Sequence, residues 1–148
     1  MAANVIYRGP IASEPQTIDC VGTGTPLPGT IAYKNAGVLT TAAAAQVGAK
    51  LYIVNNRREI GQDVATAYAS GDLLNAYEPV PGEKYQVRSA AVTHAAGNKL
   101  ALGASGRLTN VIAAGDNVVA YFDGTAGAVS AGDLIDVIWA GAGGTAIA

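Results

Sequence analysis

The sequence predicts an all-β protein from its glycine usage, a repeated turn and the short length of its apolar segments. Glycine accounts for 19 of the 148 residues and falls between apolar stretches. Gly71-Asp72 and several similar pairs each stand directly before an apolar run. The apolar runs are short and bounded by turn residues, which is typical of strands rather than of helices.

The repeated turn joins a glycine to an acidic residue immediately before a predicted strand. Glycine adopts a positive φ angle without steric cost, and an aspartate carboxylate accepts a hydrogen bond from a nearby backbone N–H. The residues expected to form these turns are Gly71, Asp72, Gly115, Asp116, Gly132 and Asp133. Gly97-Asn98 is a variant of the same turn. The unequal spacing of the turns excludes a solenoid and favours a small barrel or sandwich.

The first 28 residues are predicted to form an N-terminal arm followed by an extended loop. Residues 4–8 and 17–21 have the pattern of short strands, whereas residues 22–29 contain prolines and glycines that do not fit a sheet interior. The arm, residues 1–12, is expected to be ordered only by a partner.

The arm contains apolar side chains that are expected to have no place in the core of the chain itself. These are Val5, Ile6, Tyr7 and Ile11, and they lie next to Arg8. Deleting residues 2–11 is therefore expected to leave thermal stability nearly unchanged and to weaken attachment to the partner, where strand addition would order the arm.

From Thr30 onward the pattern predicts a single β domain over residues 29–140. Residues 31–34 and 38–40 form an expected hairpin with Gly37 in the left-handed conformation, and residues 51–54 are the strongest strand. The further strands are predicted at 73–78, 84–92, 99–102, 107–112, 118–122 and 134–139.

Three other segments of the chain are predicted to lack strands. An irregular crossing is expected over residues 41–46 and one helical turn over 64–68. The glycine-rich residues 141–148 are expected to form a flexible or partner-ordered tail.

Charge and composition argue against several classes of function. The chain has 9 basic and 11 acidic residues, a net charge of −2, and no cluster of the kind that binds nucleic acid. A single Cys excludes an internal disulfide, and a single His excludes a multi-His metal site within one chain. No stretch approaches the roughly 18 apolar residues of a membrane span. Residues 1–10 lack the pattern of a signal peptide. No cofactor, nucleic acid or membrane partner is expected.

The residues with reactive or binding chemistry favour structural roles. His94 has no nucleophile motif around it. The residues on either side of Cys20 predict a half-buried thiol. Trp139 is expected in the core, with a subunit contact as the alternative. Arg57 and Arg58 form the tightest basic pair; they are either solvated or placed to meet an acidic patch of a partner. The turn aspartates could also suggest metal ligands, but their positions favour turns.

A series of turn motifs resembles one known family. In chain order they are Pro28-Gly29-Thr30, Gly37, Ile60-Gly61-Gln62-Asp63, Tyr68-Ala69-Ser70-Gly71-Asp72, Pro81-Gly82-Glu83 before Tyr85, Ala96-Gly97-Asn98-Lys99-Leu100, and Gly103-Ala104-Ser105-Gly106-Arg107-Leu108. In order and spacing, residues 29–140 resemble the phage capsid cement, or head decoration, family. The resemblance implies a small β-barrel or β-tulip-like domain that binds the outside of an icosahedral head, often as a trimer.

On this resemblance the chain is expected to be a structural virion protein rather than an enzyme. It would be made in the host cytoplasm, bind the major capsid protein as a homotrimer, and stabilise the outer capsid surface. The expected capsid-binding residues are Val5, Ile6, Tyr7, Arg8, Ile11, Arg57 and Arg58. The alternative is an exposed virion module that binds a host-surface glycan, for which the seven Tyr residues would supply aromatic surface.

Overall fold

The strands of the computed structural model confirm the predicted all-β class. The structure describes residues 4–10, 14–43, 49–140 and 145–146. Within these residues the strands pair antiparallel in a seven-stranded, a five-stranded and a two-stranded sheet. The helical segments of the described residues are two short 3-10 helices, η1 (Arg58–Ile60) and η2 (Ala104–Gly106).

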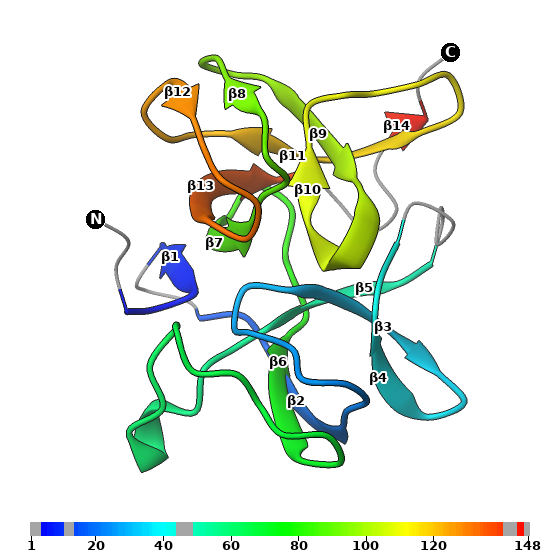
Figure 1. The fold of residues 1–148 in the computed structure, drawn as a ribbon, viewed down its shortest axis with the longest axis vertical. Helices are drawn as coiled ribbons and strands as arrows, with labels where there is room; N and C mark the ends of the chain where they lie inside the picture. The colour runs from blue at the N-terminus through cyan, green and yellow to red at the C-terminus, as the bar shows by residue number, and fades with distance from the viewer. Residues whose placement is uncertain (1–3, 11–13, 44–48, 141–144, 147–148) are drawn as a thin grey trace.

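The first barrel is formed by the five-stranded sheet, in the lower half of Figure 1. Its strands are β2 (Thr17–Val21), β3 (Ile31–Asn35), β4 (Val38–Thr41), β5 (Leu51–Val54) and β6 (Leu73–Tyr77), in the spatial order β2-β6-β5-β3-β4. A parallel bridge between Gly22 and Leu39 joins the two ends of this order. The Thr23 N–H donates to the Leu39 carbonyl at 3.0 Å. The sheet therefore closes on itself.

The second barrel is formed by most of the seven-stranded sheet, in the upper half of Figure 1. The strands of this sheet are β1 (Tyr7–Gly9), β7 (Lys84–Arg88), β9 (Lys99–Leu102), β10 (Leu108–Thr109), β11 (Asn117–Phe122), β13 (Leu134–Trp139) and β14 (Thr145–Ala146). Their order is β1-β7-β13-β11-β9-β10, with β14 paired to β11. A parallel bridge from Ser89 to Leu108 joins the end of β7 to β10. The small β8 (Thr93–His94) and β12 (Gly127–Ala128) pair beside this barrel.

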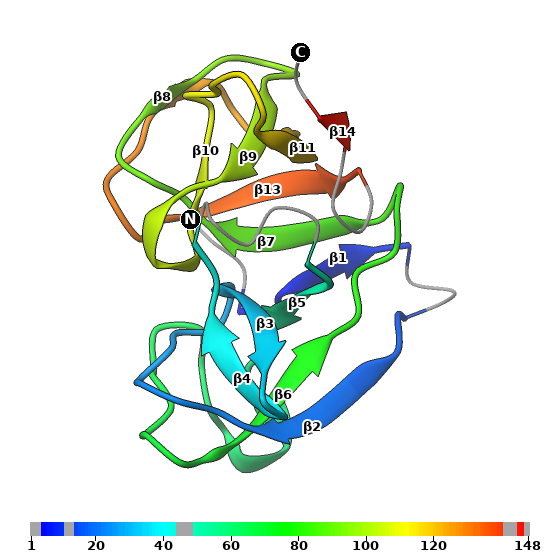
Figure 2. The same ribbon diagram turned by 90° about the vertical axis from the view of Figure 1, so that its right-hand side faces the viewer.

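The two barrels share one hydrophobic core, which makes the described chain a single domain. β5 shows why: Leu51 and Ile53 belong to the main cluster with Val87 and Val137 of the second barrel. Tyr52 and Val54, on the other face of β5, pack in a smaller cluster within the first barrel. Both faces of β5 are therefore buried, which explains its unbroken apolar sequence. Figure 2 shows the barrels stacked, with β1 and β5 lying between them.

The turns lie where the sequence predicts them. Each turn is closed by two hydrogen bonds between an Asp or Asn and the residue three positions before it. The side-chain oxygen of the Asp or Asn accepts from the backbone N–H of the earlier residue at 2.8–2.9 Å. The backbone N–H of the Asp or Asn donates to the carbonyl of the earlier residue at 3.1–3.2 Å. The pairs are Asp72 with Ala69, Asp116 with Ala113, Asp133 with Ser130, and Asn98 with Ala95. The aspartates therefore close turns that lead into strands.

The expectation that the N-terminal residues lack a place in the core is wrong. Ile6 is fully buried in the main cluster, and β1 pairs with β7. The Gln86 N–H donates to the Ile6 carbonyl at 2.7 Å. β2 forms where the pattern predicts a strand over residues 17–21, and it pairs along its whole length with β6. The prolines and Gly9 interrupt the strand pattern locally, but β7 and β6 offer edges for the segments on either side. Ile11 lies outside the described residues.

Local differences from the predicted elements have local causes. Residues 64–68 form no helical turn: the Thr66 N–H donates to the Asp63 carbonyl at 3.2 Å in a single turn, and the Asp63 carboxylate accepts from Ala65 N–H and Thr66 Oγ1, each at 2.9 Å. The strand predicted to reach residue 92 ends at Arg88, and the one predicted to reach residue 112 ends at Thr109. Part of the expected tail forms β14 on β11. Of the crossing expected over residues 41–46, residues 44–46 lie outside the described part of the chain.

Candidate functional site

Several residues expected to contact a partner meet in one hollow, here called the β1 hollow. Its lining residues are Val5, Tyr7, Arg8, Gly9, Glu14 and Arg58, and its volume is about 310 Å³. They come from β1 and the segment before it, from the segment before β2 and from η1. Segments far apart in the sequence therefore build one surface.

An aromatic cluster holds the β1 hollow in place. The Tyr7 ring lies 5.8 Å from that of Tyr77 and 5.5 Å from that of Tyr85, and Trp139 packs edge-on against Tyr85 at 6.5 Å. The Tyr77 hydroxyl donates to Glu14 Oε1 at 2.7 Å, which positions the carboxylate in the hollow. Burial, and after it the neighbouring Glu83, raises the pKa of Tyr7 to about 12.

The charged groups of the β1 hollow are loosely paired. Arg58 Nη2 lies 3.6 Å from Glu14 Oε1, and Arg8 Nη1 lies 3.9 Å from Asp136 Oδ1. These ion pairs are long and solvent-accessible, so each contributes roughly 0–1 kcal/mol to stability. Both guanidinium groups can therefore exchange these carboxylates for those of a partner at little cost.

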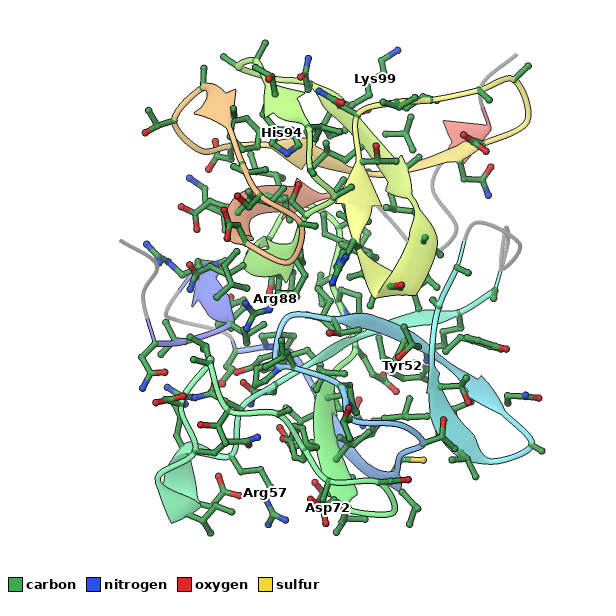
Figure 3. The ribbon with its side chains drawn as sticks, viewed as in Figure 1. Tyr52, Arg57, Asp72, Arg88, His94 and Lys99 are labelled. Atoms are coloured by element: carbon green, nitrogen blue, oxygen red, sulfur yellow. The ribbon has the colours of Figure 1, made fainter. Side chains whose placement is uncertain are left out.

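Arg57 does not join its neighbour Arg58. It lines a different hollow of about 320 Å³ together with Ile60, Tyr68, Asp72 and Leu73, at the lower end of the molecule in Figure 3. Its Nε donates to Glu59 Oε1 at 2.8 Å, and this hydrogen bond lowers the pKa of the Glu59 carboxyl. Sequence reasoning treated the two arginines as one feature, whereas η1 directs them to different surfaces.

Apolar side chains lie exposed around this second hollow, and the sequence analysis did not single them out. Ile60 is 70% exposed and Leu73 45% exposed, and Val21, the cross-strand partner of Leu73, is 48% exposed. Their exposure depends on which strand face they occupy at the end of the barrel. Strand alternation is the signal that could have found two of them, because it places Val21 on the face of Asp19 and Leu73 on the face of Asn75.

The structure thus places the predicted contact residues in different environments. Val5, Tyr7, Arg8 and Arg58 meet in the β1 hollow. Ile6 faces the core, so the expectation that it contacts a partner is wrong. Glu14 was missed, because a lone acidic residue before a proline carries no signal of the tyrosine and arginine that it contacts in the fold.

His94, in β8 beside the second barrel, is buried. Its ring stacks on Phe122 at 4.5 Å with an interplanar angle of 10°, and its Nε2 lies 2.9 Å from Ser89 Oγ. The Ser89 hydroxyl donates to the Ala90 carbonyl at 2.8 Å, so this network assigns the His94 proton to Nε2. Both side chains are at most 1% exposed. Ser89 and His94 are therefore packed in the interior and shielded from solvent.

The burial of His94 predicts an acid-sensitive fold. Burial lowers the pKa of His94, and Nδ1 is buried without a hydrogen-bond partner in the described structure. The unfolded chain therefore binds this proton more readily, and stability falls as the pH drops below the ordinary value of about 6.5. We expect the melting temperature to be lower at pH 5.5 than at pH 7.5, and His94→Gln to reduce this difference. An equal pH dependence in both proteins would contradict the assignment.

The remaining candidates occupy structural positions. Cys20 is half-buried, with its Sγ 3.2 Å from the Gly37 carbonyl, and Trp139 is 1% exposed in the core as expected. Within the described residues, no three His, Cys, Asp or Glu side chains are grouped so as to hold a metal ion. Across the same part of the chain, no helix has the length and apolar character needed to cross a membrane.

Comparison with solved structures identifies a similar fold. The chain is similar to the crystal structure of the N base of head fiber gp8.5 in bacteriophage phi29, with a TM-score of 0.57 and 14% sequence identity. The similarity covers 84% of this chain and 93% of that chain. No family model matches the sequence, and no curated protein matches it. At this identity the comparison establishes the shared fold.

Proposed function

We propose that this chain is a structural protein of a phage virion that binds the outer surface of an icosahedral head and stabilises it. The observation that supports this most directly is the fold shared with the head fiber base over 93% of that chain. The order of turn motifs resembles the head decoration family independently of that comparison. The proposed partner is the major capsid protein.

Stabilisation of a head by such a subunit follows from mass action. A ligand that binds only the assembled lattice stabilises it by RT ln(1 + [L]/Kd), roughly 2.7 kcal/mol per site at a hundredfold excess over Kd. A subunit that spans several capsid proteins must lose all of those contacts before the lattice opens locally. We propose a homotrimer, because an icosahedral shell offers three-fold positions and closed rings satisfy head-to-tail contacts. A reconstruction of decorated heads would contradict this if it showed isolated monomers away from three-fold positions.

The β1 hollow is the surface proposed to contact the head. It combines the partly buried Tyr7 with two arginines whose ion pairs are weak. Tyrosine and arginine are enriched among the residues that dominate the energy of protein interfaces. The hollow sits on paired strands and a packed aromatic cluster, so a partner would meet a preorganised surface.

Co-sedimentation tests the proposed attachment. The purified protein is mixed with empty heads of the phage that encodes it, from which the protein has been omitted, and the heads are pelleted. We expect saturable recovery of the protein in the pellet. If the protein stays in the supernatant at concentrations above those that saturate comparable head proteins, the proposal fails. Binding to a glycan array in that case would support the alternative of a host-recognition module.

Replacing Arg8 and Arg58 together with alanine is expected to weaken attachment to heads at least about thirtyfold, which corresponds to a hot-spot loss of about 2 kcal/mol. The melting temperature should change little, because both arginines form only weak surface pairs. Lys99→Ala, which removes an exposed positive charge in another part of the molecule, is the control (Figure 3). Equal binding by the double variant and the control would exclude the β1 hollow as the contact surface.

A further inference from the structure

A third hollow lies at the junction of the two barrels and is here called the waist hollow. Its volume is about 300 Å³. The first barrel, including its loop between β2 and β3, contributes hydroxyl groups, and the second barrel contributes a hydroxyl group and two guanidinium groups. The side chains concerned are those of Thr25, Thr30, Thr41, Ser105, Arg88 and Arg107.

Arg88 is fixed at the edge of this hollow by backbone carbonyls. Its Nε donates to Pro28 O at 2.8 Å, its Nη1 donates to Gly132 O at 2.9 Å, and its Nη2 donates to Val64 O. These acceptors come from three separate segments, so Arg88 fastens both barrels at the waist, where Figure 3 shows it. All three acceptors are neutral carbonyl groups, so they do not compensate the guanidinium charge. The guanidinium group has two further N–H donors.

Arg107 brings a second positive charge to the same place. A Cβ atom built on Gly132 would lie 3.6 Å from Arg107 Nη2, so the two guanidinium groups flank this glycine. The Arg107 guanidinium makes no hydrogen bond or ion pair with any residue that the structure describes. Burial lowers the pKa of Arg88; the Arg107 charge lowers it further, and Asp133 opposes both effects.

Acidic side chains are missing from the lining of the waist hollow as far as the structure describes it. The positions outside the described ranges are Met, Ala, Ile, Ser, Gln, Val and Gly residues, so none of them carries a carboxylate side chain. Asp133 is the acidic residue that influences Arg88, and its Oδ2 already accepts from the Ser130 N–H. The hollow therefore has an excess of positive charge and hydrogen-bond donors.

We propose that the waist hollow is a binding site for a small oxyanion, a carboxylate or a phosphate group. The planar guanidinium of Arg107 offers paired N–H donors that match two oxygens of such a group. Arg88 supplies a preorganised second charge, and the surrounding hydroxyls can donate to the remaining oxygens. The site is separate from the β1 hollow, so it does not depend on the proposed attachment to heads.

Nuclear magnetic resonance titration of the full chain tests this site. Inorganic phosphate and, separately, acetate are added at constant ionic strength maintained with sodium chloride. We expect saturable shifts of the Arg107 Nε–Hε resonance and of the Ser105 and Arg107 amides with at least one probe. Which probe binds more tightly distinguishes a phosphate source from a carboxylate source.

The Arg107→Gln variant distinguishes a specific binding site from non-specific electrostatic attraction. We expect this variant to bind the probe at least about tenfold more weakly, a difference of about 1.4 kcal/mol. Lys99→Gln removes one positive charge at an exposed position outside the waist hollow and should bind as the parent chain does. Non-saturable shifts in the parent chain, unchanged affinity in Arg107→Gln, or an equal loss in both variants would each overturn the proposal. Arg88 is left intact because it fastens the fold.

Discussion

Replacing Ile6 with alanine is expected to lower the free energy of unfolding by about 2–5 kcal/mol, the range for truncating a buried aliphatic side chain. Ile6 is fully buried in the cluster that joins both barrels, although it lies only a few residues from the N-terminus. Its removal leaves a cavity in this cluster, and the loss of stability grows with the cavity volume that remains after relaxation. Chemical denaturation monitored by Trp139 fluorescence measures the effect.

Ile60→Ala is the matched control for this substitution. It removes the same atoms from a side chain that is 70% exposed, so we expect a change within about 0.5 kcal/mol. Deletion of residues 2–11 should be destabilising for the same reason as Ile6→Ala, contrary to what the sequence alone suggests. If Ile6→Ala and Ile60→Ala prove equally mild, β1 does not contribute to the folded core in solution.

Replacing Gly106 with alanine is expected to cost about 2–5 kcal/mol of stability, combining a strained backbone with overpacking. Gly106 has a φ of +66°, and its N–H donates to the Ala42 carbonyl at 2.7 Å. A Cβ atom there would lie 2.5 Å from Thr30 Cγ2 and 2.6 Å from the Ile31 carbonyl oxygen. The η2 turn of the second barrel would therefore have to move away from the first barrel. The measurement is the midpoint and slope of urea unfolding.

Gly97→Ala isolates the backbone contribution. Gly97 has a similar φ of +73°, but a Cβ atom there would meet nothing within 4 Å. We expect it to cost roughly 1–2 kcal/mol, the price of a left-handed conformation for a residue with a side chain. The difference between the two variants measures the packing of the barrels against each other. Equal losses would show that the barrels do not meet closely at Gly106.

The local pattern of the chain was sufficient to predict its turns and most of its strands. Asp72, Asp116 and Asp133 each bond a backbone N–H three residues earlier, and this short-range chemistry depends little on the rest of the molecule. The strands at 51–54, 99–102 and 134–139 have the predicted bounds. The all-β class followed from the same signals.

The candidate sites were only partly predictable. Tyr7, Arg8 and Arg58 were proposed from the sequence as contact residues, and the fold brings them together. Glu14 lies beside them because the packed Tyr77 donates a hydrogen bond to its carboxylate. Arg57 lies in a different hollow from Arg58 because of the direction of η1. The two arginines of the waist hollow lie 19 positions apart, and only the fold brings them together. Arg107 entered the sequence analysis only as part of a turn motif, not as a binding residue.

The sequence by itself determined the class of fold and the positions of the turns, and its single Cys excludes an internal disulfide, since these depend on residue type and short-range geometry. Tertiary structure decided that the strands close into two barrels, through single parallel bridges at Gly22–Leu39 and Ser89–Leu108. It also decided that Ile6 is a core residue. An exposed apolar arm and a buried edge strand have the same local pattern. Which of them forms depends on whether β7 leaves an edge unpaired, a property of the whole sheet.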